Sequence, residues 1–297
     1  MEQGPIQWFP GHMAKTRRKI TESLPLVDMV IEVIDARVPV SSRNPELGAL
    51  IADKPRLLIL NKADLADEAA TRRWVAAFVQ QGLPALAADC KSGRGLGQIV
   101  PHMRQILAPQ TEMWEKKGMV GRPLHAMVVG IPNAGKSSFI NRLAKGGRAK
   151  TEDRPGVTRG NQWFTVDGGV LLLDTPGVLW PKFDDPQVGL HLAFTGAIRD
   201  QILDVEELAC GLLQVLARDY PGRLRERYKL PGNPADPLPE DGWELLEHIG
   251  KKRGMLVSGG EVDTERAAAM LLDEYRGGKL GRITVEWPDP LPAGQEE

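Results

Sequence analysis

Residues 130–137, GIPNAGKS, have the types and spacing of a loop that holds phosphate. They fit the pattern G-x-x-x-x-G-K-[ST], in which glycines let backbone N–H groups curl around phosphate, the lysine reaches the outer phosphates and the hydroxyl holds Mg²⁺. The apolar run LHAMVVG precedes the loop and the helical run SSFINRLA follows it, so a helix N-terminus would add its dipole. A chance match is expected in only ~1% of chains of this length. We assign nucleotide contacts here to Asn133, Ala134, Gly135, Lys136, Ser137 and Ser138.

A second motif, Asn61-Lys62-Ala63-Asp64, ends the apolar run that begins at Leu57. In the pattern N-K-x-D, a carboxylate at Asp64 can accept hydrogen bonds from N1 and N2 of guanine, which adenine cannot offer. A buried carboxylate left without those donors makes the wrong base costly. An ordinary Asn turn is the alternative, but a strand end in a chain with a phosphate loop favours a guanine reader. The later segment ADCKSG adds Cys90 and Lys91 to the predicted base site.

Two further segments can complete the site around a third phosphate. Residues 174–177, DTPG, follow an apolar run, so Asp174 can hold Mg²⁺ through water while the Gly177 amide meets the γ-phosphate. Thr158 is the candidate switch I threonine, with Thr151 and Thr165 as alternatives. The sequence therefore predicts a site for GTP and GDP. The assigned Mg²⁺ ligands are Ser137, Thr158 and Asp174, and the assigned catalytic residues so far are Lys136, Thr158 and Gly177.

These residues need strands to position them. Short β-rich runs alternate with helical patterns up to about residue 180, as in MVIEVIDA, RLLILN, HAMVVG, NQWFTV and GVLLLD. Such alternation predicts an α/β fold with a mostly parallel sheet and helices on both faces. One helix is legible over residues 68–81, where Val75, Phe78 and Val79 share a face.

The strand signal fades from about residue 186, and helical patterns follow. Asp204 and Asp241 each stand three residues before a glutamate, which is the spacing of a capping box. Residues 263–276 carry another apolar face, ended by glycines. We predict a nucleotide-binding domain over residues 1–185, an all-α domain over residues 186–285 and a disordered tail over residues 286–297.

The order of the motifs is unusual, because the base reader precedes the phosphate loop. The base loop comes first, and ADCKSG, the phosphate loop, switch I and the D-x-x-G loop follow. In an α/β sheet the site depends on where loops lie in space, not on their order along the chain. Joining the original chain termini and opening the chain at another loop can therefore preserve the site. The sequence predicts a circularly permuted GTPase domain whose chain runs from Gly177 into the helical domain.

Composition limits the class of protein further. A chain of 297 residues with 42% hydrophobic and 26% charged residues is typical of a soluble globular protein of about two domains. The net charge of −1 means that an anionic partner must meet local basic patches. The N-terminus has no apolar h-region, and no run approaches the roughly 18 apolar residues of a membrane span. Cys90 and Cys210 stand far apart, so we expect neither a disulfide framework nor a zinc site, and a cytoplasmic location.

Three basic clusters are candidates for contact with RNA, although such runs are usually solvated faces. Further basic residues around switch I, from Arg148 to Arg159, could also touch RNA or order that loop. The clusters are Lys15, Arg17, Arg18 and Lys19; Arg223, Arg225, Arg227 and Lys229; and Lys251, Lys252 and Arg253.

Several stretches join the motif order in a wider pattern: IQWFPGHMAK near the start, VIDARVPVSSRNP after the first strand, and GKKRG with GGEVD near the C-terminus. On these residues the chain resembles the ribosome biogenesis GTPase A family over nearly its whole length. The resemblance implies a GTPase that acts late in assembly of the bacterial large (50S) ribosomal subunit. It would bind the precursor particle and its rRNA in the GTP state and leave after hydrolysis. We expect no DNA partner, no integral membrane association and a monomer away from the ribosome.

The resemblance also bears on catalysis. Val178 and Leu179 stand where Ras-like enzymes carry a water-orienting Gln, so intrinsic hydrolysis should be slow and stimulated by the particle. The resemblance implies that His12 is brought towards the nucleotide on the ribosomal particle; capping the following helix or contacting RNA is the alternative. Asn133 matches an asparagine that coordinates K⁺ in potassium-dependent GTPases, where the cation neutralises phosphate charge. A plain loop-stabilising role is the alternative for Asn133.

Two other functions are compatible with the motifs. One is a nucleotide-gated RNA-binding module with negligible turnover, which the missing Gln supports. The other is a P-loop ATPase or kinase, since the phosphate loop alone does not choose the base. Turnover measured with and without large-subunit particles, and nucleotide competition, separate these functions.

Overall fold

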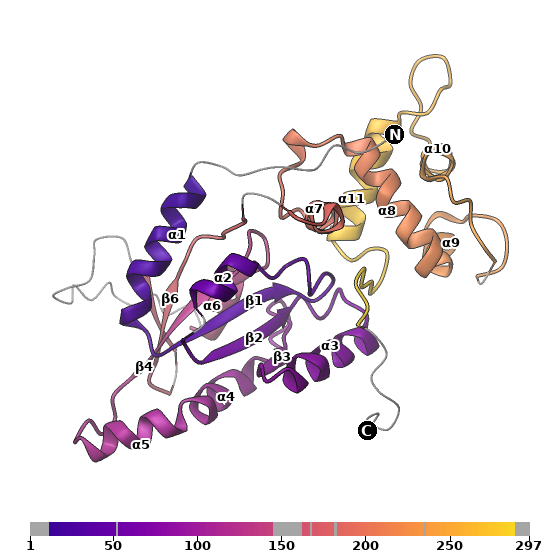
Figure 1. The fold of residues 1–297 in the computed structure, drawn as a ribbon. Coiled ribbons are helices and arrows are strands. Elements are labelled where there is room, and N and C mark those ends of the chain that lie inside the picture. The colour runs from indigo at the N-terminus through magenta and orange to yellow at the C-terminus, as the bar shows by residue number, and fades with distance from the viewer. Residues whose placement is uncertain are drawn as a thin grey trace. The chain divides into compact units, whose positions relative to one another are not determined.

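The computed structural model describes residues 12–51, 53–144, 162–166, 168–180, 183–234 and 236–288. It divides into two compact units, which are drawn in Figure 1. Phe183–Val285 form the helical unit, and the described residues before and after this range form the sheet unit.

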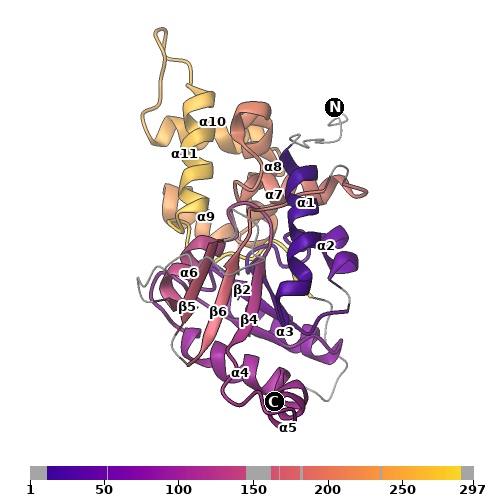
Figure 2. The same cartoon turned by 90° about the vertical axis from the view of Figure 1, so that its left-hand side faces the viewer.

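Six strands make one sheet in the sheet unit, in the order β3-β2-β1-β4-β6-β5 (Figures 1 and 2). All neighbours are parallel except β5, which pairs antiparallel with β6. Every residue of β1 is buried, as expected for a parallel strand covered on both faces. The register sets Asp35 beside Asn61, so β1 and β2 end at the same edge. The strands are β1 Met29–Asp35, β2 Arg56–Asn61, β3 Ala85–Ala87, β4 Leu124–Val129, β5 Gln162–Val166 and β6 Val170–Asp174.

Helices cover both faces of this sheet. Val30 and Ile34 lie on one face of β1, because alternate strand residues share a face. Val30 packs in a cluster with α1 and α2, and Ile34 packs in a cluster with α3. Helix α6 contacts β4 and β6 from the opposite face (Figure 2). The helices are α1 His12–Ser23, α2 Pro45–Leu50, α3 Glu68–Gln80, α4 Ile99–Ile106, α5 Ala108–Lys116 and α6 Lys136–Leu143, with 3-10 turns at Leu24–Leu26 and Leu96–Gln98.

The predicted α/β class and mostly parallel sheet are confirmed, and all five predicted strands are present. The helix predicted at residues 68–81 is α3, which Asp67 caps by accepting a hydrogen bond from the Ala70 N–H at 2.9 Å. The sequence gives no sign of β3, because three residues are too few for a periodic pattern.

The helical unit is built around α8, which contacts α7, α9, α10 and α11. Leu208, Leu212 and Leu216 of α8 are buried at helical spacing. Asp204 and Asp241 cap α8 and α10 through their carboxylates, as their positions before each helix predict. The helices are α7 Pro186–Phe194, α8 Val205–Asp219, α9 Pro221–Tyr228, α10 Gly242–Lys252 and α11 Thr264–Arg276, with a 3-10 turn at Asp200–Ile202.

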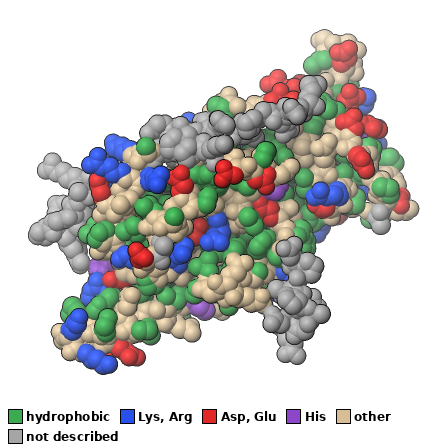
Figure 3. All heavy atoms as spheres, in the orientation of Figure 1, with side chains coloured by type: hydrophobic (Ala, Val, Ile, Leu, Met, Phe, Trp, Pro, Cys, Tyr) green, Lys and Arg blue, Asp and Glu red, His purple; other side chains and the backbone are tan. Residues whose placement is uncertain are grey.

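Some of the basic residues suggested for RNA contact also make contacts that stabilise the fold of this unit. Glu274 is 5% exposed and accepts hydrogen bonds from the Arg227 guanidinium and, at 2.9 Å, from the Tyr228 hydroxyl, with Arg253 at 3.6 Å. Arg225 is also buried and donates to two backbone carbonyls. Acidic side chains stand beside basic ones on the face of this unit drawn in Figure 3.

The chain returns to the sheet unit at Glu286, inside the range predicted as a disordered tail. Trp74 Nε1 of α3 donates to the Glu286 carbonyl at 2.7 Å, and Arg73 donates to the Pro288 carbonyl at 3.1 Å. Proline-rich composition suggests disorder, but these donors of α3 fix the first residues of the tail. Residues 289–297 lie outside the described residues.

In the part of the chain that the structure describes, no helix has both the length and the apolarity to cross a membrane.

Candidate nucleotide site

The phosphate loop lies between β4 and α6, as its mechanism requires. Gly135 precedes α6 with φ +93°, a conformation that favours glycine. A Cβ atom at Gly135 would lie 2.2 Å from Nδ2 of Asn61. Glycine is therefore required here by its backbone conformation and by the close approach of the base-reading motif.

The two motifs that stand far apart in the chain meet directly. Asn61 Nδ2 donates to the Ala134 carbonyl at 2.8 Å across 73 positions of sequence. The Ala63 N–H donates to the Ala88 carbonyl at 3.1 Å, which joins the base reader to the segment ADCKSG. The structure thus brings base loop, ADCKSG and phosphate loop to one edge of the sheet, where the parallel strands end.

Lys136 and Asp174 lie at the phosphate end of the site, close enough for each to affect the pKa of the other. Lys136 is 8% exposed, and its Nζ donates to the Ile131 carbonyl of the phosphate loop at 2.8 Å. Burial lowers the pKa of Lys136 to about 8, although Asp174 opposes that shift. Burial also raises the pKa of Asp174, whose Oδ1 is buried without a hydrogen-bond partner among the described residues. A ligand that brings phosphate to the lysine and a cation to the carboxylate would stabilise the charged form of both buried groups.

The base end of the site contains a pair of carboxylates. Burial and the neighbouring Asp89 raise the pKa of Asp64. Asp89 Oδ1 accepts hydrogen bonds from the Lys91 and Ser92 N–H groups at 2.8 and 3.2 Å, which shapes the loop ADCKSG. Burial raises the pKa of Cys90 to about 12, so this thiol stays protonated. Guanine N–H donors at Asp64 would relieve the crowding of negative charge.

The D-x-x-G loop packs against the phosphate loop. A Cβ atom at Gly177 would lie 2.7 Å from the Pro132 backbone nitrogen, and the Val178 N–H donates to the Gly130 carbonyl at 3.2 Å. Val178 and Leu179 are 3% and 0% exposed. These two side chains are therefore part of the core and cannot orient an attacking water.

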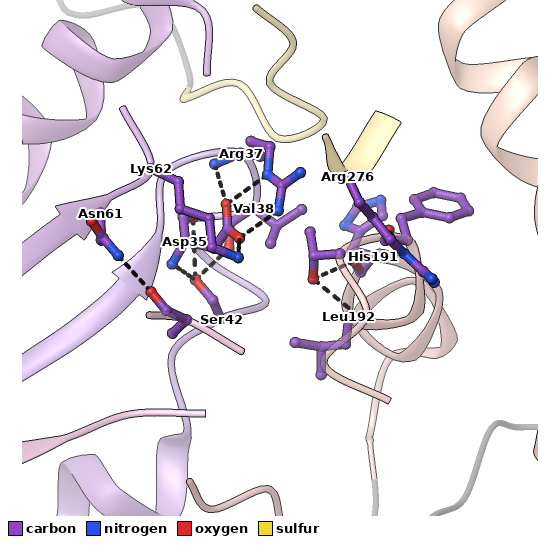
Figure 4. A network of polar contacts seen from close by, with 12 residues as sticks. Asp35, Arg37, Val38, Ser42, Asn61, Lys62, His191, Leu192 and Arg276 are labelled. Carbon is purple, nitrogen blue, oxygen red and sulfur yellow. Dashed lines mark hydrogen bonds and ion pairs between the residues drawn. The ribbon is translucent and has the colours of Figure 1, made fainter. Parts of the chain in front are cut away.

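A buried ion cluster beside the base reader joins the predicted Lys62 to Asp35 and Arg37, which were not among the predicted site residues. Asp35 ends β1 and is held by Arg37 through Nε at 2.9 Å and a second nitrogen at 2.8 Å. Lys62 of the N-K-x-D motif reaches the same carboxylate at 2.9 Å (Figure 4). These two cations lower the pKa of Asp35 despite complete burial. The signal in the sequence was an aspartate at the end of an apolar run followed by an arginine.

Several predicted site residues lie outside the described residues, and three others lie at the surface. Thr158, its alternative Thr151 and the basic residues from Arg148 to Arg159 lie outside the described residues, as does the side chain of His12. Asn133 lies in the phosphate loop with φ +58° and is exposed. Ser137 and Ser138 lie in the first turn of α6 and are also exposed.

The sheet is mostly parallel, the N-K-x-D motif is hydrogen-bonded to the phosphate loop, and the D-x-x-G loop packs on that loop. Together these features define a P-loop GTPase with permuted motif order. Residues 125–228 match the protein family described as 50S ribosome-binding GTPase. The match begins in β4, so the base-reading segment lies before it in this chain.

Comparison with whole proteins places the chain more narrowly. It is 49% identical over 284 residues to Ribosome biogenesis GTPase A of Bacillus cereus, covering 96% of this chain and 94% of the relative. A GDP-bound structure of YlqF is similar with a TM-score of 0.66 at 29% identity, covering 92% of this chain and all of the other. A GNP-bound structure of YlqF from T. maritima gives 0.64 at 28% identity, covering 93% of this chain and all of the other.

This chain belongs to the ribosome biogenesis GTPase A family. It is a GTPase with a role in ribosome assembly, and it binds guanine nucleotides. Family membership favours hydrolysis of GTP over the two alternatives, an ATPase or kinase and a binding module without turnover.

Proposed function

We propose that this GTPase binds the precursor of the large ribosomal subunit through its rRNA in the GTP state and is released after hydrolysis. The observation that carries the proposal is family membership together with the description of the matching family model, 50S ribosome-binding GTPase. The partner surface would use basic side chains that the fold leaves outside ion pairs with buried carboxylates. Lys15 at the start of α1 and Lys252 at the end of α10 are exposed candidates.

The site residues would divide the work of binding. Asp64 would bind the guanine, with the segment of Cys90 and Lys91 beside the base. Residues 133–138, which include Lys136, would hold the phosphates. Ser137, Asp174 and Thr158 would hold Mg²⁺, which neutralises phosphate charge when bound. The unpaired buried oxygen of Asp174 fits a cation at this place. Gly177 would donate its amide to the γ-phosphate.

Hydrolysis in the isolated protein would be slow, because Val178 and Leu179 are buried apolar groups where a water-orienting Gln is needed. His12 would supply the missing function on the particle. Helix α1 supports this role, since it starts at His12 and ends at Ser23 before the amino end of β1. The helix therefore runs antiparallel to β1, so its N-terminal end lies on the side of the sheet edge that carries the nucleotide loops. Lys19 of α1 is close enough to Asp174 to affect its titration.

Release after hydrolysis would begin at Gly177. The chain passes from this glycine through Val178 and Trp180 into the helical unit, so loss of the γ-phosphate contact would reposition that unit. Scattering and hydrogen exchange should then differ between GDP-bound and GTP-analogue-bound protein beyond the nucleotide loops. Identical profiles would contradict this release route.

GTP turnover on precursor large subunits tests the proposal. Wild type should be stimulated by roughly 10-fold or more, by analogy with activated GTPases, and His12→Ala should lose the stimulation while keeping GDP affinity. Glu115→Ala, an exposed change on α5, serves as the control. An unstimulated wild type would contradict the partner, and an undiminished His12→Ala rate would remove the histidine from catalysis.

A K⁺ requirement is a separate part of the proposal and depends on Asn133. The same turnover assay in K⁺ and in Na⁺ should favour K⁺, and Asn133→Gly should abolish the preference. Glycine tolerates the φ of +58° at this position, so the variant removes only the side chain. Equal rates in the two salts would restrict Asn133 to a structural role.

A further inference from the structure

The loop at residues 36–44, between β1 and α2, connects the base reader with the end of the chain. At its first end, Asp35 is 1% exposed and binds both Arg37 and Lys62. Lys62 adopts φ +60°, so its place depends on contacts that hold an unfavourable conformation. The Ala36 N–H also donates to the Asn61 carbonyl at 2.8 Å. The loop is therefore attached at this end to two residues of the N-K-x-D motif.

The loop itself is held tightly by its own polar groups. Ser42 Oγ donates to the Val38 carbonyl at 2.7 Å and accepts from the Asp35 N–H at 3.1 Å. Ser41, Ser42 and Asn44 are each at most 2% exposed. A buried polar network of this kind moves as one piece, because each broken bond leaves an unpaired group.

The other end of the loop forms hydrogen bonds with two chain segments, one just before the helical unit and one just after it. Asn44 Nδ2 donates to the Val178 carbonyl at 3.2 Å, five residues before the unit begins. The Glu286 carboxylate, directly after the unit ends, accepts from the Val40 N–H at 2.6 Å and the Ser41 N–H at 3.1 Å. It also accepts a short hydrogen bond from the Ser41 hydroxyl. One loop thus holds the chain before and after the helical unit.

We propose that loop 36–44 is a lever by which the segment at Glu286 sets the position of Lys62 and so the retention of guanine nucleotide. Removal of Glu286 from the loop frees Val40 and Ser41, loosens Asp35 and shifts Lys62. A partner that pulls the segment after the helical unit would accelerate nucleotide release. Reciprocally, bound GDP would tighten the amides of Val40 and Ser41, because coupling between two sites acts in both directions. The lever rests only on the binding of guanine nucleotide and needs no particular ribosomal partner.

The test uses the full-length chain and GDP without ribosomal particles, so its failure leaves the proposed partner untouched. Glu286→Ala should lose GDP affinity by roughly fivefold or more, the lower range of allosteric coupling. Glu115→Ala should bind GDP as wild type does. In wild-type protein, hydrogen exchange at Val40 and Ser41 should slow when GDP binds. Unchanged affinity of Glu286→Ala, or equal exchange at these amides with and without GDP, overturns the proposal.

A double variant tests the route through Asp35. Asp35→Asn alone should also weaken GDP binding, because Lys62 loses its charged partner. If the lever passes through Asp35, the combined Asp35→Asn and Glu286→Ala protein binds GDP no more weakly than the worse single variant. Additive losses would mean that the two residues act separately and would contradict the lever. Should Asp35→Asn fail to fold, the exchange measurement on wild type still decides.

Discussion

Lys136 is the residue whose chemistry depends most on its surroundings. Almost complete burial and a carbonyl partner at 2.8 Å leave its charge poorly solvated, which lowers its pKa to about 8. A phosphate group next to the Nζ would favour the charged form again. Nucleotide binding therefore takes up a proton whenever the free protein has lost it.

GDP affinity should consequently fall as pH rises. Below about pH 8, Lys136 is already charged in the free protein, so GDP affinity should not change with pH. Above about pH 8, GDP affinity should drop by up to about tenfold per pH unit until the pKa of Lys136 in the complex is reached. Titration calorimetry at several pH values between about pH 7 and about pH 8.8 measures this change in affinity. Thermal melting of the nucleotide-free protein over the same range is the control. A flat affinity with unchanged melting would contradict the assigned role of Lys136.

Residue-level prediction from the sequence succeeds where a motif has a fixed pattern and fails where only the fold creates the contact. The sequence alone suggests that Asn61 and Gly135 belong to one site, and the structure places them in contact. No pattern reveals that Asp35 would pair with Lys62, because that pair depends on β1 and β2 ending level. Likewise, the sequence alone suggests that Arg227 is an exposed basic residue, whereas in the fold it pairs with Glu274 of α11.

Among the elements, α8 and α10 approach unusually closely. A Cβ atom at Gly242, the first residue of α10, would lie 2.5 Å from the Cys210 carbonyl of α8. Gly211 also lies in α8, but a Cβ atom there would meet only side-chain atoms at 3.7 Å or more. Two glycines of the same helix pair should therefore respond differently to the same change.

Gly242→Ala should destabilise the helical unit by about 1–3 kcal/mol, because α10 must move away from α8. Gly211→Ala should fit and stabilise the unit by up to about 1 kcal/mol through helix propensity. Denaturant unfolding followed by circular dichroism compares the two variants. Equal effects would show that the close approach of α8 and α10 carries no energetic weight.

Asp28 joins the beginnings of β1 and β4. It accepts hydrogen bonds from Arg122 at 2.9 and 3.0 Å and from the His125 backbone N–H at 2.8 Å. Burial raises the pKa of Asp28, but the bonds from His125 and Arg122 outweigh it and lower the pKa to about 2. A carboxylate whose pKa is lower in the folded state stabilises above its unfolded pKa, and the contribution is lost as pH falls through the folded pKa.

Asp28→Asn should therefore cost about 2 kcal/mol of unfolding free energy at neutral pH. It should also lessen the loss of stability between about pH 4 and about pH 2. Urea unfolding at several pH values measures both effects, with the exposed Asp53→Asn as the matched control. If Asp28→Asn is as stable as wild type at neutral pH, the hydrogen bonds of Asp28 do not stabilise the junction of β1 and β4.

At the scale of elements, the long periodic segments were predictable and the short ones were not. Strands β1, β2, β4 and β6 are mostly apolar, and each is followed at its carboxyl end by a polar segment of the nucleotide site, so the pattern and the function agree. The three-residue β3 exists because Leu58 offers it a parallel partner at Ala85, a long-range pairing that no local window contains. The same reason explains Glu286, whose partners in loop 36–44 lie about 245 positions away.

For the whole molecule, permutation changes what is attached to the nucleotide site. A P-loop fold needs its loops at the carboxyl ends of neighbouring strands, and the order β3-β2-β1-β4-β6-β5 supplies that from a chain that begins at the base-reading half. Along the chain, the helical unit follows the D-x-x-G loop, and the chain returns to the sheet unit at Glu286. Motif order alone predicted the first of these connections, whereas the return was visible only in the structure.

The most direct measurement compares GDP and XDP binding by wild type and Asp64→Asn. Guanine donates N–H groups to a carboxylate at position 64, whereas xanthine presents a carbonyl that an amide can donate to. Asp64→Asn should therefore lose GDP affinity by roughly 100-fold or more and gain affinity for XDP, while wild type keeps the opposite preference. If Asp64→Asn binds GDP as wild type does and ignores XDP, the base is read elsewhere, and the two distant motifs do not form one guanine nucleotide site.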